Sequence, residues 1–306
     1  MPPLAVIAGP TASGKSQLAV ALAHQIEATG RKAAIVNADS AQVYADLQIL
    51  TARPTVEEMD GVEHRLFGTW DGASACSAAD WADAAKKEIA DLHTRGTVPI
   101  LCGGTGLYIR TLLEGIAPVP NIDPGVRKRV RNLSPEYMLA ELQISDPDSA
   151  RRLGPHDTTR LSRALEVVLS TGKPLSDWQR HKVGGIEGAV TLYPCILLPP
   201  RELLYRRIDR RLEQMVTDGA LQEVEALLAR RLDPTLPVMR AIGVAEMRSI
   251  VLHGPTKTDE AVDAAKVATR QYAKRQYTWF RNQSPDWWPR VVEAPSRLSS
   301  VFAPLV

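Results

Sequence analysis

The stretch Leu4-Ala5-Val6-Ile7-Ala8-Gly9-Pro10-Thr11-Ala12-Ser13-Gly14-Lys15-Ser16 decides the fold of this chain. It begins with a short apolar run and ends in the pattern G-x-x-x-x-G-K-S, and an apolar helix pattern follows over residues 17–28. A strand, a glycine loop and a helix in this order are the context in which the pattern predicts a phosphate-binding loop.

The chemistry of this loop favours anions. Its backbone N–H groups and the helix N-terminus attract phosphate oxygens, Lys15 adds a positive charge, and Ser16 offers a hydroxyl to Mg²⁺. We therefore expect Mg²⁺ as the cofactor, and ATP or GTP is the ordinary ligand of such a loop. The expected phosphate-binding residues are Gly9, Pro10, Thr11, Ala12, Ser13, Gly14, Lys15 and Ser16.

The composition bounds the class of protein. A chain of 306 residues, of which 44% are hydrophobic and 24% charged, is typical of one large soluble domain or a domain with an insertion. The sequence has no apolar run of about 18 residues and no secretory signal pattern, so we expect no membrane partner and a cytoplasmic location. Cys76, Cys102 and Cys195 form no C-x-x-C pair, which disfavours structural zinc and disulfides.

Short apolar runs alternate with helix patterns in the first part of the chain. The candidate strands are residues 4–8, 33–37, 98–102 and, much later, 191–198. A helix pattern over residues 78–93 has Ser77 and Asp80 as a capping box and Gly96 as a stop signal. This alternation predicts an α/β fold, with a P-loop NTPase-like parallel sheet covered by helices.

A proline-rich stretch, residues 117–124, separates this pattern from a helical one. We expect residues 1–118 plus 191–306 to form the P-loop catalytic core and residues 119–190 to form a helical insertion domain. The C-terminal part reads as helical again, near residues 200–218, 220–231, 238–252 and 258–282.

The net charge of +2 is small for a protein that binds nucleic acid, but the basic residues are clustered. Binding depends on where charge lies, so the net charge is a weak test. Each cluster is open to two interpretations, a nucleic-acid contact or a solvated helix face. The main clusters are residues 127–131, 151–152, 160–163, 206–211 and 274–275.

Two loops after candidate strands carry further polar groups. Asp39 follows the second strand, and ligands of parallel sheets lie at the carboxyl ends of the strands, so Asp39 is expected beside the phosphate loop as a base or metal ligand. The alternative is a helix cap. After strand 98–102 the chain reads Gly103-Gly104-Thr105, where an ATPase often has an acid that helps to hold Mg²⁺. The missing acid makes nucleotide hydrolysis a weaker interpretation.

The helix pattern of residues 268–281 is basic on one side. At about 100° per residue, Lys266, Arg270, Lys274 and Arg281 share one stripe, which suits a phosphodiester backbone or a solvated surface. Tyr272 and Trp279 lie on the opposite side, and we expect both in the core.

Taken together, these segments resemble the tRNA dimethylallyltransferase family over about residues 4–282. Each motif alone is common, but the set in this order is highly specific. Beside the phosphate loop, the resemblance rests on Asp39-Ser40 with Gln42 and Tyr44, Thr51-Ala52-Arg53-Pro54, Ser77-Ala78-Ala79-Asp80, Gly103-Gly104-Thr105 with Leu107-Tyr108, Arg160-Leu161-Ser162-Arg163-Ala164-Leu165-Glu166-Val167, Pro237-Val238-Met239-Arg240-Ala241-Ile242-Gly243, Ala268-Thr269-Arg270-Gln271, and Lys274-Arg275-Gln276 with Trp279 and Arg281.

The resemblance implies a prenyltransferase that moves a dimethylallyl group from dimethylallyl diphosphate to N6 of the adenosine just 3′ of the tRNA anticodon. The loop would then hold a diphosphate leaving group, with Lys15 and Ser16-bound Mg²⁺ stabilising its charge. Arg207 or Arg211 matches family arginines that clamp the same group. Asp39 would accept the proton of the adenine amine, and Thr105 would orient the reacting centre.

The resemblance also implies contacts with the tRNA anticodon stem-loop, whose adenine must be extruded to reach a buried site. The insertion is expected to contact the anticodon arm, and we expect a monomer. The expected tRNA-binding residues are Asp39, Ser40, Ala41, Gln42, Thr105, Arg127, Thr159, Arg160, Leu161, Ser162, Arg163, Arg240, Gly243, Lys274, Arg275, Gln276 and Arg281.

The chain departs from the family pattern at two places. After Tyr44 the family usually has a basic residue, Gly, and later Asp-Ile-Gly before Thr-Ala-Lys-Pro, whereas residues 45–50 read Ala-Asp-Leu-Gln-Ile-Leu and Arg53 replaces the Lys. His64-Arg65 replaces a common His-His pair. We assign no role to residues 45–50 or to His64.

Three alternatives stay open at the level of sequence. A P-loop small-molecule or nucleotide kinase also has a phosphate loop followed by an Asp after the second strand. An adenylate isopentenyltransferase would prenylate free AMP, ADP or ATP, and the helical insertion and basic C-terminal helix favour a polynucleotide acceptor instead. A non-catalytic RNA-binding module would leave the phosphate loop and Asp39 unexplained.

Overall fold

The structure is a computed structural model that describes residues 1–254, 258–293 and 299–306. It divides into two compact units. The first contains residues Met1–Leu112 and Ile186–Val306, and the second contains Leu113–Gly185. The sequence places the corresponding insertion at residues 119–190. Among the described residues, no helix is long and apolar enough to cross a membrane.

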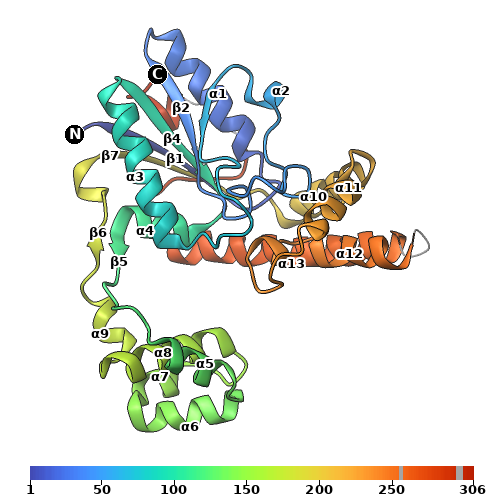
Figure 1. Ribbon diagram of the computed structural model, residues 1–306. Coiled ribbons are helices and arrows are strands. Elements are labelled where there is room, and N and C mark those ends of the chain that lie inside the picture. The colour runs from blue at the N-terminus through green and yellow to red at the C-terminus, as the bar shows by residue number, and fades with distance from the viewer. Residues whose placement is uncertain (255–257, 294–298) are drawn as a thin grey trace. The chain divides into compact units, whose positions relative to one another are not determined.

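A six-stranded sheet forms the centre of the first unit (Figure 1). Its strands are all parallel and lie in the order β3-β2-β4-β1-β7-β8. Their bounds are β1 Pro3–Ala8, β2 Lys32–Asn37, β3 Glu63–Arg65, β4 Thr97–Gly103, β7 Thr191–Leu197 and β8 Arg290–Val291. The predicted P-loop-like α/β fold is confirmed, and all four predicted strands belong to this sheet.

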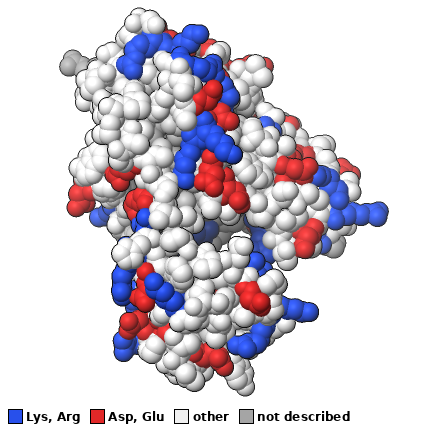
Figure 2. All heavy atoms as spheres, turned by 60° about the vertical axis from the view of Figure 1, so that its left-hand side comes forward, with Lys and Arg blue, Asp and Glu red and all other residues white. Residues whose placement is uncertain are grey.

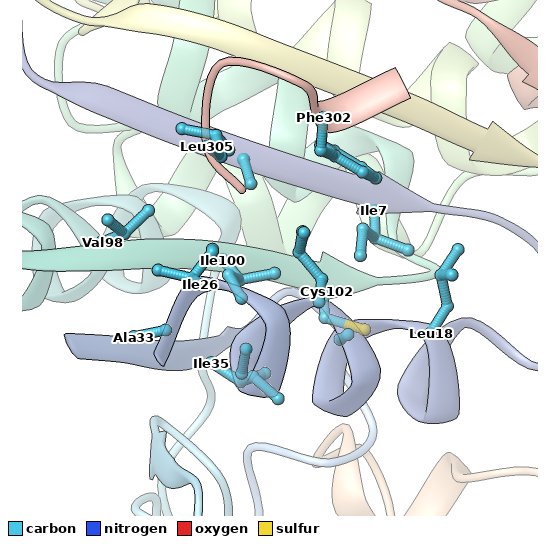
Figure 3. Packing of buried hydrophobic residues seen from close by; sticks show 14 of the residues in the cluster. Ile7, Leu18, Ile26, Ala33, Ile35, Val98, Ile100, Cys102, Phe302 and Leu305 are labelled. Atoms are coloured by element: carbon cyan, nitrogen blue, oxygen red, sulfur yellow. The ribbon is translucent and has the colours of Figure 1, made fainter. Parts of the chain in front are cut away.

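Both faces of the central strands are buried, as expected for a parallel sheet. Helix α1 (Lys15–Ala28) covers one face, and Figure 3 shows its Ile26 beside Ile100 and its Leu18 near Ile7 and Cys102 of the strands. Phe302, from the C-terminal helix α14 (Ser299–Phe302), is fully buried in the same cluster. The alternating residues of these strands point to the other face, where α3 (Ala78–Thr94) packs against β2 and β4.

The ends of α3 follow the sequence signals. The Ser77 side chain accepts the N–H of Asp80 and the Asp80 carboxylate accepts the N–H of Ser77, which is the predicted capping box. Gly96 follows with a φ of 69°, a left-handed conformation that ends the helix and that glycine adopts without steric strain. Helix α4 (Gly106–Glu114) begins directly after β4, and the short α2 (Val56–Met59) lies before β3.

The C-terminal helices pack on one another beside the sheet (Figure 1). They are α10 Arg201–Thr217, α11 Ala220–Ala229, the 3₁₀ turn η2 Val238–Arg240, α12 Val244–His253 and α13 Thr258–Gln283. One prediction was wrong here, because residues 238–252 do not form one helix. Gly243 has a φ of 96° and caps α12, which separates it from η2.

The second unit is a small helical bundle with its own core. Its helices are α5 Pro124–Arg131, α6 Pro135–Ser145, α7 Pro147–Arg152, α8 Thr158–Thr171 and α9 Leu175–Gln179. Two short strands, β5 (Gly115–Ile116) and β6 (Val183–Gly184), pair antiparallel where the chain enters and leaves it. Leu161 on α8 is fully buried in this core with Leu142 of α6, so it stabilises the bundle rather than presenting a side chain to RNA. The turn η1 (Glu187–Ala189) then leads back to β7.

Candidate active site

The phosphate loop joins β1 to α1 in the conformation that an anion site needs. Gly14 has a φ of 94° and stands at the N-cap of α1, so the first N–H groups of that helix have no capping side chain. Gly9 is required by close packing, because a Cβ there would lie 2.5 Å from the carbonyl oxygen of Leu197. The Lys15 ammonium donates to the carbonyl of Pro10 at 3.3 Å. The loop thus brings the uncapped N–H groups at the start of α1 and one ammonium close together.

A polar cavity of about 520 Å³ lies over this loop. Its lining comes from the phosphate loop, the start of α1, the segment after β2, the short α2 and β3, and helix α10. The side chains with functional groups are Thr11, Lys15, Ser16, Gln17, Asp39, Gln42, Thr51, Glu58, His64, Arg207 and Arg211.

Asp39 and Thr105 meet at the carboxyl ends of β2 and β4. Asp39 is 8% exposed, and its carboxylate accepts the N–H of Ala41 at 3.0 Å. The Thr105 hydroxyl accepts the N–H of Ser40 at 2.9 Å and donates to the Ser40 hydroxyl at 3.1 Å. Gly103 permits this approach, since a Cβ there would lie 2.1 Å from the carbonyl oxygen of Ala38. The two predicted residues are therefore neighbours in space.

A second, mostly apolar cavity of about 230 Å³ also has Asp39 in its wall. It shares Thr11, Asp39, Thr51 and Arg211 with the polar cavity, so a carboxylate and a guanidinium lie where the two cavities adjoin. Its remaining walls are Ser40, Ala41, Tyr44, Leu50, Cys76, Leu212, Met215, Pro237, Arg240, Ala241, Ile242, Thr269 and Tyr272.

The position of Tyr272 differs from the prediction made from helix periodicity. Instead of lying in the core, it lines the apolar cavity and interacts with the Thr105 hydroxyl and with Gln276. Burial and the nearby Asp39 charge raise the pKa of its phenol, so it is a neutral donor at physiological pH. Trp279 packs instead against Gly106, where a Cβ would meet its ring at 2.2 Å, and beneath the Arg110 guanidinium.

The two candidate arginines of α10 differ in position. Arg207 is exposed and donates to the carbonyls of Ala12 and Ser13 at 3.3 Å, so it braces the outside of the phosphate loop. Arg211 lies between both cavities, donates to the Thr11 hydroxyl at 2.5 Å, and leaves its buried Nε without a partner. Both arginines line the polar cavity, and Arg211 has a buried donor available for a ligand there.

Charge and burial oppose each other in this site. Burial lowers the pKa of Lys15 and of Arg211, and the negative charge of Asp39 raises both in part. An arriving anion would stabilise both cations further. Beneath Lys15, burial raises the pKa of the Cys102 thiol to about 11, which keeps this cysteine neutral and unreactive.

Two glutamines predicted to bind tRNA make internal hydrogen bonds instead. Gln276 is 5% exposed, accepts the N–H of Thr11 at 2.8 Å and donates to the carbonyl of Gly104 at 2.8 Å. Gln42 donates to the carbonyls of Thr51 and Ala52 at 3.0 and 2.7 Å. In this structure, Gln276 connects α13 to both glycine loops, and Gln42 holds the wall of the polar cavity.

The predicted basic stripe of α13 is only partly available to a ligand. Lys266 forms an ion pair with Glu213, and Arg270 pairs with Asp209, so α10 neutralises that half. Lys274, Arg275 and Arg281 are exposed further along the helix. Arg240 is exposed at the rim of the apolar cavity, and Gly243 shapes the neighbouring turn.

In the helical unit, Thr159, Arg160 and Arg163 are exposed and Ser162 is half-buried. Arg160 pairs with Asp157 in its own first turn. Arg127 lies 3.9 Å from the carboxylate of Glu166, which is buried. On the face drawn in Figure 2, basic and acidic side chains are interspersed rather than forming one continuous basic surface.

Several cavity residues had no usable sequence signal. His64 lies on short β3 and lines the polar cavity, where burial lowers the pKa of its imidazole. Leu212 and Met215 of α10 read as ordinary core positions of an amphipathic helix. Thr51 belongs to a motif quoted for the family, yet its place between both cavities follows only from the fold.

Comparison with known proteins assigns the family. The family model described as IPP transferase matches residues 42–283. This chain belongs to the IPP transferase family. It is 58% identical to the tRNA dimethylallyltransferase of Erythrobacter litoralis, over 98% of this chain and 95% of that protein. It is 60% identical to the tRNA dimethylallyltransferase of Sphingopyxis alaskensis, over 96% and 94%.

Solved structures of IPP transferases have the same fold. The full-length tRNA isopentenylpyrophosphate transferase from Bacillus halodurans aligns with a TM-score of 0.69 at 32% identity, covering 100% of this chain and 95% of that one. A eukaryotic dimethylallyltransferase described as acting on tRNA aligns with a TM-score of 0.77 at 28% identity, over 92% of this chain and 70% of that one.

Proposed function

We propose that this IPP transferase moves the dimethylallyl group of dimethylallyl diphosphate to N6 of the adenosine 3′-adjacent to the anticodon in tRNA. The names of its relatives support the activity and the tRNA substrate. The structural observation that carries the proposal is the position of Asp39, on the wall of both a polar and an apolar cavity. A proton acceptor at that junction can serve two substrates that enter from different sides.

The diphosphate belongs in the polar cavity. The loop N–H groups, Lys15 and Arg211 are directed there, and they would stabilise the charge that grows on the leaving oxygen. Arg207 acts on the same loop from outside, through the carbonyls of Ala12 and Ser13. It therefore shapes the loop and, like Arg211, lines the cavity assigned to the diphosphate.

The acceptor adenine belongs in the apolar cavity, between aliphatic side chains and the ring of Tyr272. The N6 nitrogen attacks the allylic C1 carbon, a C–N bond forms, and the C–O bond to diphosphate breaks with its electron pair on oxygen. The N6 proton passes to the Asp39 carboxylate. Thr105 and Tyr272 are hydrogen-bonding groups beside that carboxylate, and they would orient the base.

The residues present fit Mg²⁺ as the cofactor. Ser16 is exposed at the loop and lines the polar cavity, whereas no group of three or more His, Cys, Asp or Glu side chains among the described residues would hold a metal by itself. Mg²⁺ keeps most of its waters and binds through few protein groups plus substrate phosphates, which suits this arrangement. When bound, the ion would add positive charge at the leaving diphosphate.

Exposed basic residues support the anticodon stem-loop as the partner, and they include Arg160, Arg163, Arg240, Lys274 and Arg281. We propose a monomer as the working form. A cytoplasmic location is also proposed, and three buried free cysteines suit a reducing compartment.

Incubation with labelled dimethylallyl diphosphate and unmodified tRNA, followed by nucleoside analysis, tests the proposal. We expect N6-(dimethylallyl)adenosine beside the anticodon, and diphosphate as the second product. Phosphoryl transfer from ATP without any prenyl product would identify a kinase instead. Equally efficient prenylation of AMP, ADP or ATP would identify an adenylate isopentenyltransferase.

A further inference from the structure

The loop segment between Tyr44 and Arg53 is held by a carboxylate from helix α11. Glu223, in the first turn of α11, accepts the N–H groups of Gln48 at 2.5 Å, Ile49 at 2.9 Å and Leu50 at 2.9 Å. Three successive N–H groups converge on one side chain, as they would on a bound anion. Charge-assisted hydrogen bonds of this kind are short and strong, so residues 48–50 have little freedom.

The same helix makes a second attachment to this segment. Arg230, which caps the C-terminus of α11, pairs with Asp46 and, at 2.6 Å, with Asp71. Asp46 in turn accepts the N–H of Gly72 at 2.8 Å. Helix α11 therefore fixes the segment through one charge near each of its ends.

Leu50 is the residue that this arrangement places in the site. It is 7% exposed, lines the apolar cavity and packs against Gly243, where a Cβ would lie 2.6 Å from its Cδ1. Gly243 is itself fixed at a φ of 96° as the cap of α12. The wall at Leu50 is thus set on one side by Glu223 and on the other by the turn before α12.

The neighbouring wall of the polar cavity is attached to the same segment, since the N–H of Ala52 donates to the carbonyl of Ile49 at 2.9 Å, but it also has a support of its own. Gln42 donates to the carbonyls of Thr51 and Ala52, and the Thr51 hydroxyl donates to the carbonyl of Leu47 at 2.9 Å. Loss of Glu223 should therefore disturb the apolar cavity more than the phosphate side.

We propose that Glu223 is a positioning residue that acts through Leu50 to shape the cavity for the acceptor base. The inference rests on the proposed function, because it assigns the apolar cavity to the adenine of tRNA. Glu223 touches neither substrate in this scheme, and its effect is carried by the backbone of residues 48–50.

The test is a double-mutant cycle with E223A, L50A and the double variant, with E223Q as the conservative change. Glu225→Gln is the matched control, since Glu225 is exposed on the same helix. Steady-state kinetics would vary an anticodon stem-loop and dimethylallyl diphosphate separately. Amide hydrogen exchange would follow residues 47–52.

We expect E223A and L50A each to raise KM for the stem-loop by about tenfold, with KM for the diphosphate within about twofold of wild type. The double variant should be no worse than the poorer single variant, because both changes remove one element of the wall. The KM of E223Q for the stem-loop should lie between those of wild type and E223A, since its amide oxygen still accepts hydrogen bonds. E225Q should match wild type. With Leu50 intact, amide exchange at residues 47–52 should rise in E223A, more weakly in E223Q, and not in E225Q.

The inference would be overturned if the fold-increases of the two single variants multiply in the double variant. It would also be overturned if KM for the stem-loop and KM for the diphosphate rise equally in E223A. If E223A does not fold, E223Q decides: an unchanged KM for the stem-loop together with faster exchange at residues 47–52 would contradict the role of Glu223. A wild-type protein that forms no prenylated nucleoside would instead overturn the proposed function itself.

Discussion

Asp39 is buried at the end of β2, and it accepts a backbone hydrogen bond that holds its carboxylate in the cavity. Asp39→Asn keeps the oxygen that accepts the Ala41 N–H but removes the proton acceptor. We expect single-turnover prenyl transfer to fall by roughly 10²- to 10⁴-fold, the range of general base catalysis. Stem-loop affinity, measured by filter binding, should stay within about twofold of wild type. Near-normal turnover would refute the assignment of the base.

Lys15 gives a pH-dependent signature, because burial lowers the pKa of its ammonium in the folded protein. Between that lowered pKa and the ordinary value of 10.5, the unfolded chain binds more protons than the folded one at this residue. The free energy of unfolding should therefore rise with pH across this window. Denaturant unfolding from pH 7 to 10 should show a steeper rise in wild type than in Lys15→Met. An equal slope in both proteins would argue against an unfavourably buried charge.

At the scale of the element, α13 offers two lysines in different states. Lys274 is exposed, while Lys266 pairs with Glu213 at 2.8 Å. Lys274→Ala should weaken tRNA binding and lower the slope of log affinity against log salt by about one. Lys266→Ala should leave that slope unchanged, because α10 already neutralises this lysine. Binding titrations at several salt concentrations measure both, and an unchanged slope for Lys274→Ala would make its end of α13 a solvated surface.

Elements were predictable where a long periodic pattern or a cap was present. Helices α3 and α13 agree with the sequence within a residue or two, since apolar periodicity and the Ser77–Asp80 box mark them. Strands β3 and β8 have three and two residues, too few for any period, and their pairing is set by the sheet beside them. The break at Gly243 depends on its φ of 96°, which packing decides and residue type only permits.

The part of the site that belongs to short local motifs was predictable from the sequence. The phosphate loop, Asp39 and Thr105 follow strands directly, so the rule that parallel strands share their carboxyl edge places them together. Tyr272 was misplaced because periodicity separates the faces of α13 without saying what each face meets. Glu223 carried no signal, since its partners are backbone N–H groups more than 170 positions away in the sequence.

At the scale of the whole molecule, the chain leaves the α/β unit and returns to it at one place. The N–H of Ile186 donates to the carbonyl of Leu112 at 3.0 Å, so the residues that flank the helical unit are already adjacent. Each unit also has its own hydrophobic cluster, around Ile7, Ile35 and Ile100 in the first and around Leu142 and Leu161 in the second. These are the features expected of an inserted domain that folds on its own core.

Deletion of the helical unit should therefore weaken tRNA binding while diphosphate binding is kept. In a variant with residues 113–185 replaced by a short Gly-Ser linker, we expect cooperative unfolding of the remaining unit. Because all phosphate-loop and cavity residues stay, inorganic diphosphate should still raise its Tm. The variant loses Arg127, Arg160 and Arg163, so stem-loop affinity should fall at least about tenfold and tRNA prenylation should fall with it. Thermal unfolding with and without diphosphate measures the first two outcomes, filter binding measures the affinity, and nucleoside analysis measures prenylation. Unchanged stem-loop affinity would place tRNA recognition in the α/β unit alone, and loss of cooperative unfolding would show that the two units depend on each other for stability.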